Sequence, residues 1–242
     1  MTDMAIPTAN GPVQAYVSEP SGPGPWPGVV VIHDVFGMSH DLRRQADWLA
    51  GAGYLAAAPD LHHGGRKLPC MISMMREARA RRGRTFDDIE AVRTWLTTRS
   101  DCTGRIGVIG YCMGGGFALL LAPNHGFTAA SVNYGIASKD VYTDQFLTGA
   151  CPIVGSYGKK DRGNRGTAVR LERILTAVGV DHDIKEYPDA GHMFLNDHDH
   201  DPADVPAVLA VMGKMTGSSF HEPSAADARA RIIGFFDQHL KG

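Results

Sequence analysis

The chain has 242 residues, of which 43% are hydrophobic and 21% charged, the composition of an ordinary globular protein. Its 24 basic and 26 acidic side chains give a net charge of -2, so charge gives no support for binding nucleic acid or an anionic membrane surface. The length suits one α/β domain over residues 1–242, and no linker or internal repeat divides it.

The N-terminal stretch and the cysteines bear on location. No basic region followed by an apolar segment begins the chain, and no apolar run is long enough to span a bilayer, so we expect neither a signal peptide nor a membrane segment. Four cysteines are widely spaced, without a CxxC pair: Cys70, Cys102, Cys112 and Cys151. This spacing predicts neither a disulfide framework nor a structural zinc site, and it favours the reducing cytoplasm.

Apolar runs and helical patterns alternate through the first half of the chain. The patterns predict a strand at 27–34, a helix at 39–53 with Ser39 as N-cap, a strand at 54–60, a helix at 85–99 and a strand at 105–111. Thr85 and Asp88 have the spacing of a capping box at the start of the helix that contains them.

The second half continues the alternation. It predicts helices at 115–122, 165–179 and 224–240 and strands at 128–135, 151–158 and 182–187, the last one more exposed because polar and apolar residues alternate in it. This order of elements predicts an α/β fold, a mostly parallel twisted sheet with helices on both faces.

Two stretches interrupt the alternation. Residues 62–84 form a basic insertion with a predicted short helix at 70–82, and residues 196–222 form a long connection before the final helix. Because ligands in open α/β sheets bind beyond the carboxyl ends of the strands, long excursions of this kind tend to be functional.

One cysteine lies at a predicted strand-to-helix corner. The stretch Gly110-Tyr111-Cys112-Met113-Gly114 matches G-x-S-x-G with sulfur in place of the hydroxyl, the pattern of a nucleophile elbow. The helix N-terminus at such a corner stabilises a negative charge and so favours the thiolate. Free cysteines are usually small buried hydrophobes, and that interpretation fits the other three. For Cys112 the corner favours a nucleophile.

A nucleophilic cysteine needs a base and a group that orients the base. In α/β-hydrolases these follow the nucleophile in the order acid, then histidine. Asp161 comes just after the predicted strand 151–158, and His192 comes on the loop after the strand 182–187. A single loop Asp or His is more often a solvated surface residue, but the pair in this order predicts a catalytic triad.

The segments "GYCMGG", "GKKD" and "YPDAGHMF" resemble the dienelactone hydrolase family, a cysteine branch of the α/β-hydrolase fold, and the resemblance extends over nearly the whole chain. It implies a single-domain α/β-hydrolase fold with Cys112 as nucleophile, His192 as base and Asp161 as acid. It also implies an oxyanion hole formed by the backbone N–H groups of Val35 and Met113.

In that family a carboxylate lies near the resting thiol, and here Asp34 stands where the family usually has Glu. One methylene less shortens its reach by about an ångström. The sequence therefore favours the oxyanion role of Val35 over a contact between Asp34 and the thiol.

The implied reaction is hydrolysis of a small carboxylic ester or lactone without a cofactor. An arginine that binds the substrate's carboxylate in the family is replaced by Asn196, and the family's second such arginine has loosely aligned counterparts in the insertion, among them Arg76 and Arg79. Asn196, Arg76 and Arg79 are therefore candidate substrate-binding residues. The oligomeric state does not follow from the sequence.

"NDHDHDPAD" (196–204) contains His198 and His200 among aspartates. Residues two apart point to opposite sides of an extended chain, so we favour a solvated acidic loop over a metal site. His62 and His63 either line the pocket or lie in solvent.

Two other functions remain open. Glutamine amidotransferases also carry a cysteine at a glycine-rich elbow, but an acid follows their histidine by two residues, where this chain has Phe194. A redox-sensing thiol is the second alternative, and Cys112 lacks a nearby resolving cysteine in sequence.

Overall fold

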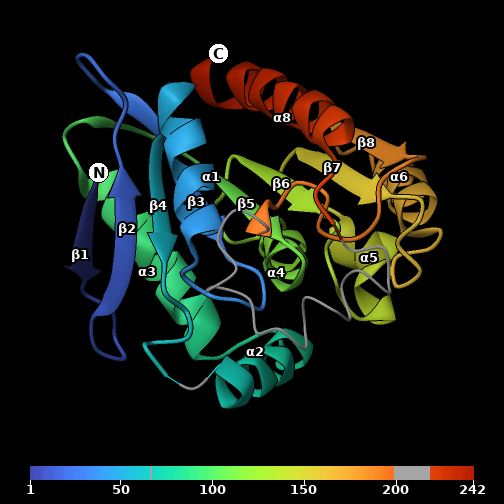
Figure 1. Cartoon of the computed structure of the whole chain (residues 1–242), viewed down its shortest axis with the longest axis horizontal. Coiled ribbons are helices and arrows are strands. Elements are labelled where there is room, and N and C mark those ends of the chain that lie inside the picture. The colour runs from blue at the N-terminus through green and yellow to red at the C-terminus, as the bar shows by residue number, and fades with distance from the viewer. Residues whose placement is uncertain (66, 199–218) are drawn as a thin grey trace.

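The computed structural model describes residues 1–65, 67–198 and 219–242, and its centre is an eight-stranded sheet in the order β1-β2-β4-β3-β5-β6-β7-β8 (Figure 1). The strands are β1 (Thr2–Ile6), β2 (Val13–Ser18), β3 (Trp26–Ile32), β4 (Leu55–Pro59), β5 (Cys102–Tyr111), β6 (Ala129–Asn133), β7 (Ile153–Gly158) and β8 (His182–Tyr187). From β4 to β8 all neighbours are parallel, whereas β1 and β2 pair antiparallel. The predicted α/β class is confirmed.

The helices are α1 (His40–Gly51), α2 (Lys67–Ala80), α3 (Arg84–Thr98), α4 (Met113–Leu121), α5 (Asp144–Leu147), α6 (Thr167–Val178) and α8 (Glu222–Phe236), with short turns at Lys139–Val141 and Asp237–Lys241. Residues 2–6 and 13–18 form strands that the sequence analysis did not predict. The helix expected at 70–82 begins three residues earlier, at Lys67.

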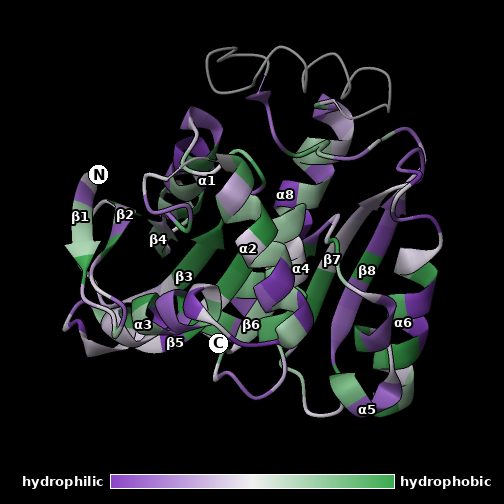
Figure 2. Cartoon of the chain, turned by 90° about the horizontal axis from the view of Figure 1, so that it is seen from below, coloured by the Kyte–Doolittle hydropathy of each residue, from purple (hydrophilic) through white to green (hydrophobic). Residues whose placement is uncertain are grey.

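The sheet has an apolar core on each face. Val29 and Val31 belong to a cluster with α1 and α8, while Val30 and Ile32 belong to a second cluster with α3, α4 and α6. Successive side chains of a strand point to opposite faces, so a continuous apolar run feeds both cores. In Figure 2 the inner strand β3 is accordingly hydrophobic, and the edge strand β8 is mostly hydrophilic, as predicted.

The start of α3 corrects one prediction. Thr85 and Asp88 do not form a capping box, because Gly83 is the N-cap residue and provides no side-chain cap. Glu77 of α2 caps the helix instead, since its carboxylate accepts a hydrogen bond of 2.7 Å from the Thr85 N–H. Asp88 is fully buried and contacts His63 at 3.3 Å and Arg84 at 3.4 Å.

The corner between β5 and α4 depends on two glycines. A Cβ atom at Gly110 would lie 2.0 Å from the Gly114 carbonyl oxygen, and a Cβ atom at Gly114 would lie 2.4 Å from the Ile32 carbonyl oxygen. Both contacts are with backbone, which cannot rotate away as a side chain can. The glycines therefore let the N-terminus of α4 approach the ends of β3 and β5.

We expect Gly114→Ala to lower the free energy of unfolding by about 1–3 kcal/mol, because the added methyl group overpacks a backbone contact. Gly234→Ala is the matched control: it lies in α8 with open space around its Cβ direction and should gain about 0.5–1 kcal/mol from helix propensity. Urea unfolding of both variants tests this, and equal stability of Gly114→Ala and the unmodified protein would contradict it.

Candidate active site

Cys112 lies between β5 and α4 in an unusual backbone conformation with positive φ, at φ of 54° and ψ of -113°. Its N–H donates to the Asn133 carbonyl at 3.1 Å, and its carbonyl accepts from the Gly116 and Ile136 N–H groups, each at 3.1 Å. A non-glycine residue in this region is strained and persists only where its surroundings hold it. These bonds hold the sulfur at the top of the sheet, at the N-terminal end of α4.

The predicted base and acid come together at the same edge of the sheet. Asp161 follows β7 and His192 follows β8, and the His192 Nδ1 lies 2.6 Å from the Asp161 Oδ2. The Cys112 side chain also interacts with this imidazole and contributes to its raised pKa. The structure thus places Asp161 in contact with His192, and His192 is influenced in turn by Cys112.

Asp161 is buried and its carboxylate has three partners. Besides His192, it accepts hydrogen bonds of 2.9 Å from the Asn164 side chain and 2.9 Å from the Gly163 N–H. Burial raises the pKa of the Asp161 carboxyl, but the contacts with His192, Asn164 and Gly163 outweigh it and hold the pKa below its usual range. The acid is therefore ionised and oriented toward the imidazole.

His192 is the most strongly perturbed base of the site. Burial lowers the pKa of its imidazole, but the hydrogen bonds with Asp161 and Cys112 and the charges of both outweigh it and raise the pKa to about 10. The imidazole is therefore protonated at neutral pH.

The remaining cysteines lie away from this cluster. Cys70, Cys102 and Cys151 are partly buried free thiols. Burial raises the pKa of the Cys102 thiol and raises that of Cys151 to about 12. Both thiols are therefore poor nucleophiles at neutral pH, in agreement with their interpretation as small core residues.

Two backbone N–H groups beside the sulfur were predicted as the oxyanion hole. Met113 is the first residue of α4, where helix N–H groups have no partner within the helix. Val35 lies in the loop between β3 and α1, and no hydrogen bond between described residues uses its N–H. The two segments touch, because a Cβ atom at Gly114 would also lie 2.5 Å from the His33 carbonyl oxygen.

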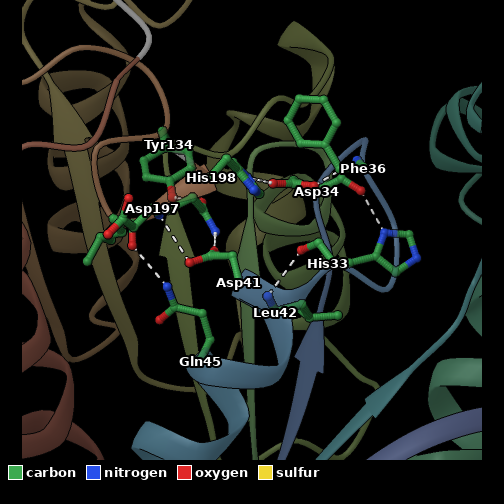
Figure 3. A network of polar contacts seen from close by, with 12 residues as sticks. His33, Asp34, Phe36, Asp41, Leu42, Gln45, Tyr134, Asp197 and His198 are labelled. Atoms are coloured by element: carbon green, nitrogen blue, oxygen red, sulfur yellow. Dashed lines mark hydrogen bonds and ion pairs between the residues drawn. The ribbon is translucent and has the colours of Figure 1, made fainter. Parts of the chain in front are cut away.

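The carboxylate of Asp34 has partners other than the thiol. Its Oδ1 accepts a hydrogen bond of 2.7 Å from the Phe36 N–H, and its Oδ2 lies 2.8 Å from the His198 Nε2 (Figure 3). Among the described residues, no hydrogen bond joins the Asp34 carboxylate to the Cys112 thiol. The side chain shapes the turn that carries Val35 and joins it to His198.

Asn196 occupies the place of the family's carboxylate-binding arginine, yet its side chain is buried. Its Oδ1 accepts from the Tyr134 hydroxyl, and its Nδ2 donates to the Asp41 Oδ2 at 2.6 Å. Asp41 also accepts from the Asp197 N–H at 3.0 Å. The amide of Asn196 is thus used within the protein and not presented to a substrate.

Tyr134 links the two loops that carry the acid and the base. Its ring contacts the His192 ring at 5.2 Å between centroids, its carbonyl accepts from the Asn164 side chain at 3.1 Å, and its hydroxyl bonds to Asn196. The sequence analysis assigned no role to Tyr134, Asn164 or Asp41, because their partners lie far away in the chain.

The other residues singled out in the sequence differ in how far they are exposed to solvent. Arg76 and Arg79 are exposed on α2, and His62 is buried with its ring 4.7 Å from that of His33. The acidic stretch is not simply solvated where the structure describes it, since His198 is largely buried against Asp34. His200 and most of that stretch lie outside the described residues.

Within the described parts of the chain, no helix combines the length and apolarity needed to cross a membrane. The same parts hold no group of three or more His, Cys, Asp or Glu side chains arranged to bind a metal ion.

Comparison with known proteins places the chain in a class and a family. Among solved structures, a "Putative Dienelactone Hydrolase" from Klebsiella pneumoniae aligns over 98% of both chains, with a TM-score of 0.76 and 26% identity. A dienelactone hydrolase-like promiscuous phosphotriesterase, P91, aligns over 99% of this chain and 98% of its own with a TM-score of 0.79; its 20% identity shows the fold alone. The fold is that of the α/β-hydrolases.

The model of the dienelactone hydrolase family matches residues 13–240, and the chain belongs to that family. Proteins named "Putative carboxymethylenebutenolidase" are 27% identical over 98% of this chain and 88% of theirs in Yersinia pestis, and 27% identical over 99% and 100% in Azospirillum brasilense. The chain is therefore a hydrolase of the ester and lactone type. Family membership also favours hydrolysis over the amidotransferase and redox alternatives.

We expect Asp161→Asn to lower the pKa of His192 from about 10, because the amide removes both a charge and an ionic hydrogen bond while the ring stays buried. An NMR titration of the imidazole measures the shift. Asp189→Asn is the matched control, since Asp189 is an exposed carboxylate three positions before His192 that pairs with Lys160. An unchanged pKa in Asp161→Asn would show that another group sets the charge of His192.

Proposed function

We propose that this protein hydrolyses carboxylic esters or lactones by a Cys112-His192-Asp161 triad, with the N–H groups of Val35 and Met113 as the oxyanion hole. The observation that carries the proposal is the contact chain from Cys112 through His192 to Asp161 at the head of α4. Family membership supports the same reaction class.

In the proposed reaction the Cys112 thiolate attacks the carbonyl carbon, and the new C–S bond gives a tetrahedral oxyanion held by the two N–H groups. The C–O bond then breaks as protonated His192 gives its proton to the leaving oxygen, which leaves a thioester on Cys112. His192, now neutral, takes a proton from water, the hydroxide attacks the thioester, and the acid is released as the thiolate and imidazolium re-form.

The raised pKa of His192 supports this order of events. A protonated imidazole paired with a thiolate needs no separate activation step before attack, and Asp161 keeps the ring in place throughout. The same carboxylate stabilises the positive charge of the imidazole, so His192 stays protonated above neutral pH. An amine leaves much less readily than an alkoxide or enolate, so peptides are poor substrates.

We expect Cys112→Ala to lower kcat/KM for an aryl ester by about 10⁴-fold or more, because no other thiol at the site replaces the nucleophile. Cys102→Ala and Cys151→Ala are the matched controls and should keep most activity. Turnover of a panel of lactones and aryl esters measures this. Retention of most activity in Cys112→Ala would refute the mechanism.

We also propose a weakened preference for substrates with a free carboxylate. A charge-assisted hydrogen bond contributes about 1.5–3 kcal/mol, roughly ten- to a hundredfold in binding, and an amide in place of arginine loses that charge. Asn196, moreover, has its amide engaged by Tyr134 and Asp41. A less acidic substrate, or one anchored by an arginine of the insertion such as Arg76 or Arg79, fits this arrangement.

We expect kcat/KM for opening of a carboxylate-bearing dienelactone to be no higher than for opening of its methyl ester, with little dependence on ionic strength. The methyl ester differs only at the charge, so the ratio isolates the carboxylate. Arg76→Gln and Arg79→Gln test whether either arginine anchors a charged substrate. A preference for the acid of about tenfold or more that neither arginine variant removes would contradict the proposal.

A further inference from the structure

His33 is a fully buried ionisable residue with no place in the triad. It follows β3 directly, and its Nε2 lies 3.2 Å from the Leu61 backbone nitrogen, whose N–H donates to it. The Nε2 atom is therefore an acceptor, and the proton of the neutral ring is on Nδ1. Nδ1 then donates to the Asp34 carbonyl oxygen at 2.6 Å (Figure 3). Burial lowers the pKa of His33, which keeps this neutral form.

The partner of His33 is half of a particular peptide group. The Asp34 carbonyl and the Val35 N–H belong to the same planar trans peptide, so they point in opposite directions. A hydrogen bond that holds the carbonyl on one side therefore also sets the direction of the N–H on the other. The Gly37 N–H, at 3.4 Å from the same oxygen, adds a second, longer contact.

The two N–H groups that follow Val35 in this turn have partners, whereas the Val35 N–H has none among the described residues. The Phe36 N–H is taken by the Asp34 carboxylate at 2.7 Å, and the Gly37 N–H faces the Asp34 carbonyl. The His33 ring is itself held in place, because the His62 ring meets it edge-on with centroids 4.7 Å apart. The turn is thus held by the Asp34 carboxylate on one side and by the His33 ring on the other.

We propose that His33 is a positioning residue of the oxyanion hole: its imidazole bridges the Leu61 N–H and the Asp34 carbonyl and so aims the Val35 N–H at the carbonyl oxygen of a substrate attacked by Cys112. The proposal rests on the proposed function, because it needs a tetrahedral intermediate on the Cys112 sulfur. His33 acts through Val35 and touches no reacting atom.

The test compares His33→Leu with His33→Asn, two nearly isosteric side chains of which only Asn has an N–H near the position of Nδ1. Both leave the Leu61 N–H without its acceptor, so their difference reports the bond to the Asp34 carbonyl. Two rates are measured: acylation by an aryl ester, which needs the oxyanion hole, and alkylation of Cys112 by iodoacetamide, which needs the thiolate but forms no oxyanion.

We expect His33→Leu to lower kcat for acylation by about 10²–10³-fold, the loss typical of one oxyanion donor, with KM and the alkylation rate unchanged. His33→Asn should restore most of the lost rate. If His33→Leu does not fold, His33→Gln replaces it, since its longer amide reaches the place of Nε2 and lacks a donor at Nδ1. The same loss is expected.

Acylation by the Leu or Gln variant at the unmodified rate would overturn the proposal. A parallel fall in acylation and alkylation would overturn it too, because the residue would then support the site as a whole. Both results leave the mechanism intact as long as ester hydrolysis still requires Cys112. Failure of the proposed function is a different result, namely activity that survives Cys112→Ala.

Discussion

The close approach of α4 to the ends of β3 and β5 is the constraint on which the site depends. Only a residue without a side chain fits at Gly110 and Gly114, where the Cβ atoms would lie 2.0 Å and 2.4 Å from backbone oxygens. This contact puts the N-terminus of α4 beside the loop after β3. Cys112 and both proposed oxyanion donors thus come from segments in backbone contact, and Cys112 keeps its strained conformation because three backbone hydrogen bonds hold it.

The acid and the base reach this corner on separate loops, and Tyr134 joins those loops. Its backbone carbonyl accepts a hydrogen bond from the Asn164 side chain, which also donates to Asp161. Its hydroxyl donates to Asn196, four residues after His192. Burial raises the pKa of the Tyr134 hydroxyl well above its usual value, so the group stays neutral. A neutral donor suits a position between the charged triad and the Asp41 carboxylate.

Local patterns predicted most of the fold and pointed to the residues of the proposed triad, and they failed where the structure depends on a partner distant in sequence. Strand 182–187 was predicted with its observed bounds, and Ser39 caps α1 as expected, with its hydroxyl 3.1 Å from the Leu42 N–H. The cap of α3 was wrong because Glu77, in a different helix, provides the acceptor. The N-terminal hairpin was missed because its strands are short and the outer one is largely exposed.

In the candidate site, too, local patterns identified some residues, whereas contacts between residues distant in sequence could not be predicted. Cys112, Asp161 and His192 could be predicted because each follows its own strand and the fold brings those ends together. The surroundings of Asn196 could not be predicted, since the acceptor of its amide, Asp41, is 155 positions away in sequence. His33 directly precedes Asp34 and Val35 in sequence, but its tautomer depends on the Leu61 N–H, 28 positions away, and no local pattern encodes that contact.

One continuous segment, residues 33–45, supports both halves of the site. Its first residues form the turn of Val35, and its last belong to α1, where the Gln45 amide donates to the Leu195 carbonyl at 2.9 Å and accepts from the Tyr111 hydroxyl at 3.2 Å. Tyr111 directly precedes the nucleophile, and Leu195 follows the base by three positions. Gln45 in the second turn of α1 therefore connects the segment of Cys112 with that of His192, through hydrogen bonds to a neighbour of each. Because α1 begins shortly after the turn that carries Val35, the same segment connects that turn to the contacts of Gln45 with Leu195 and Tyr111.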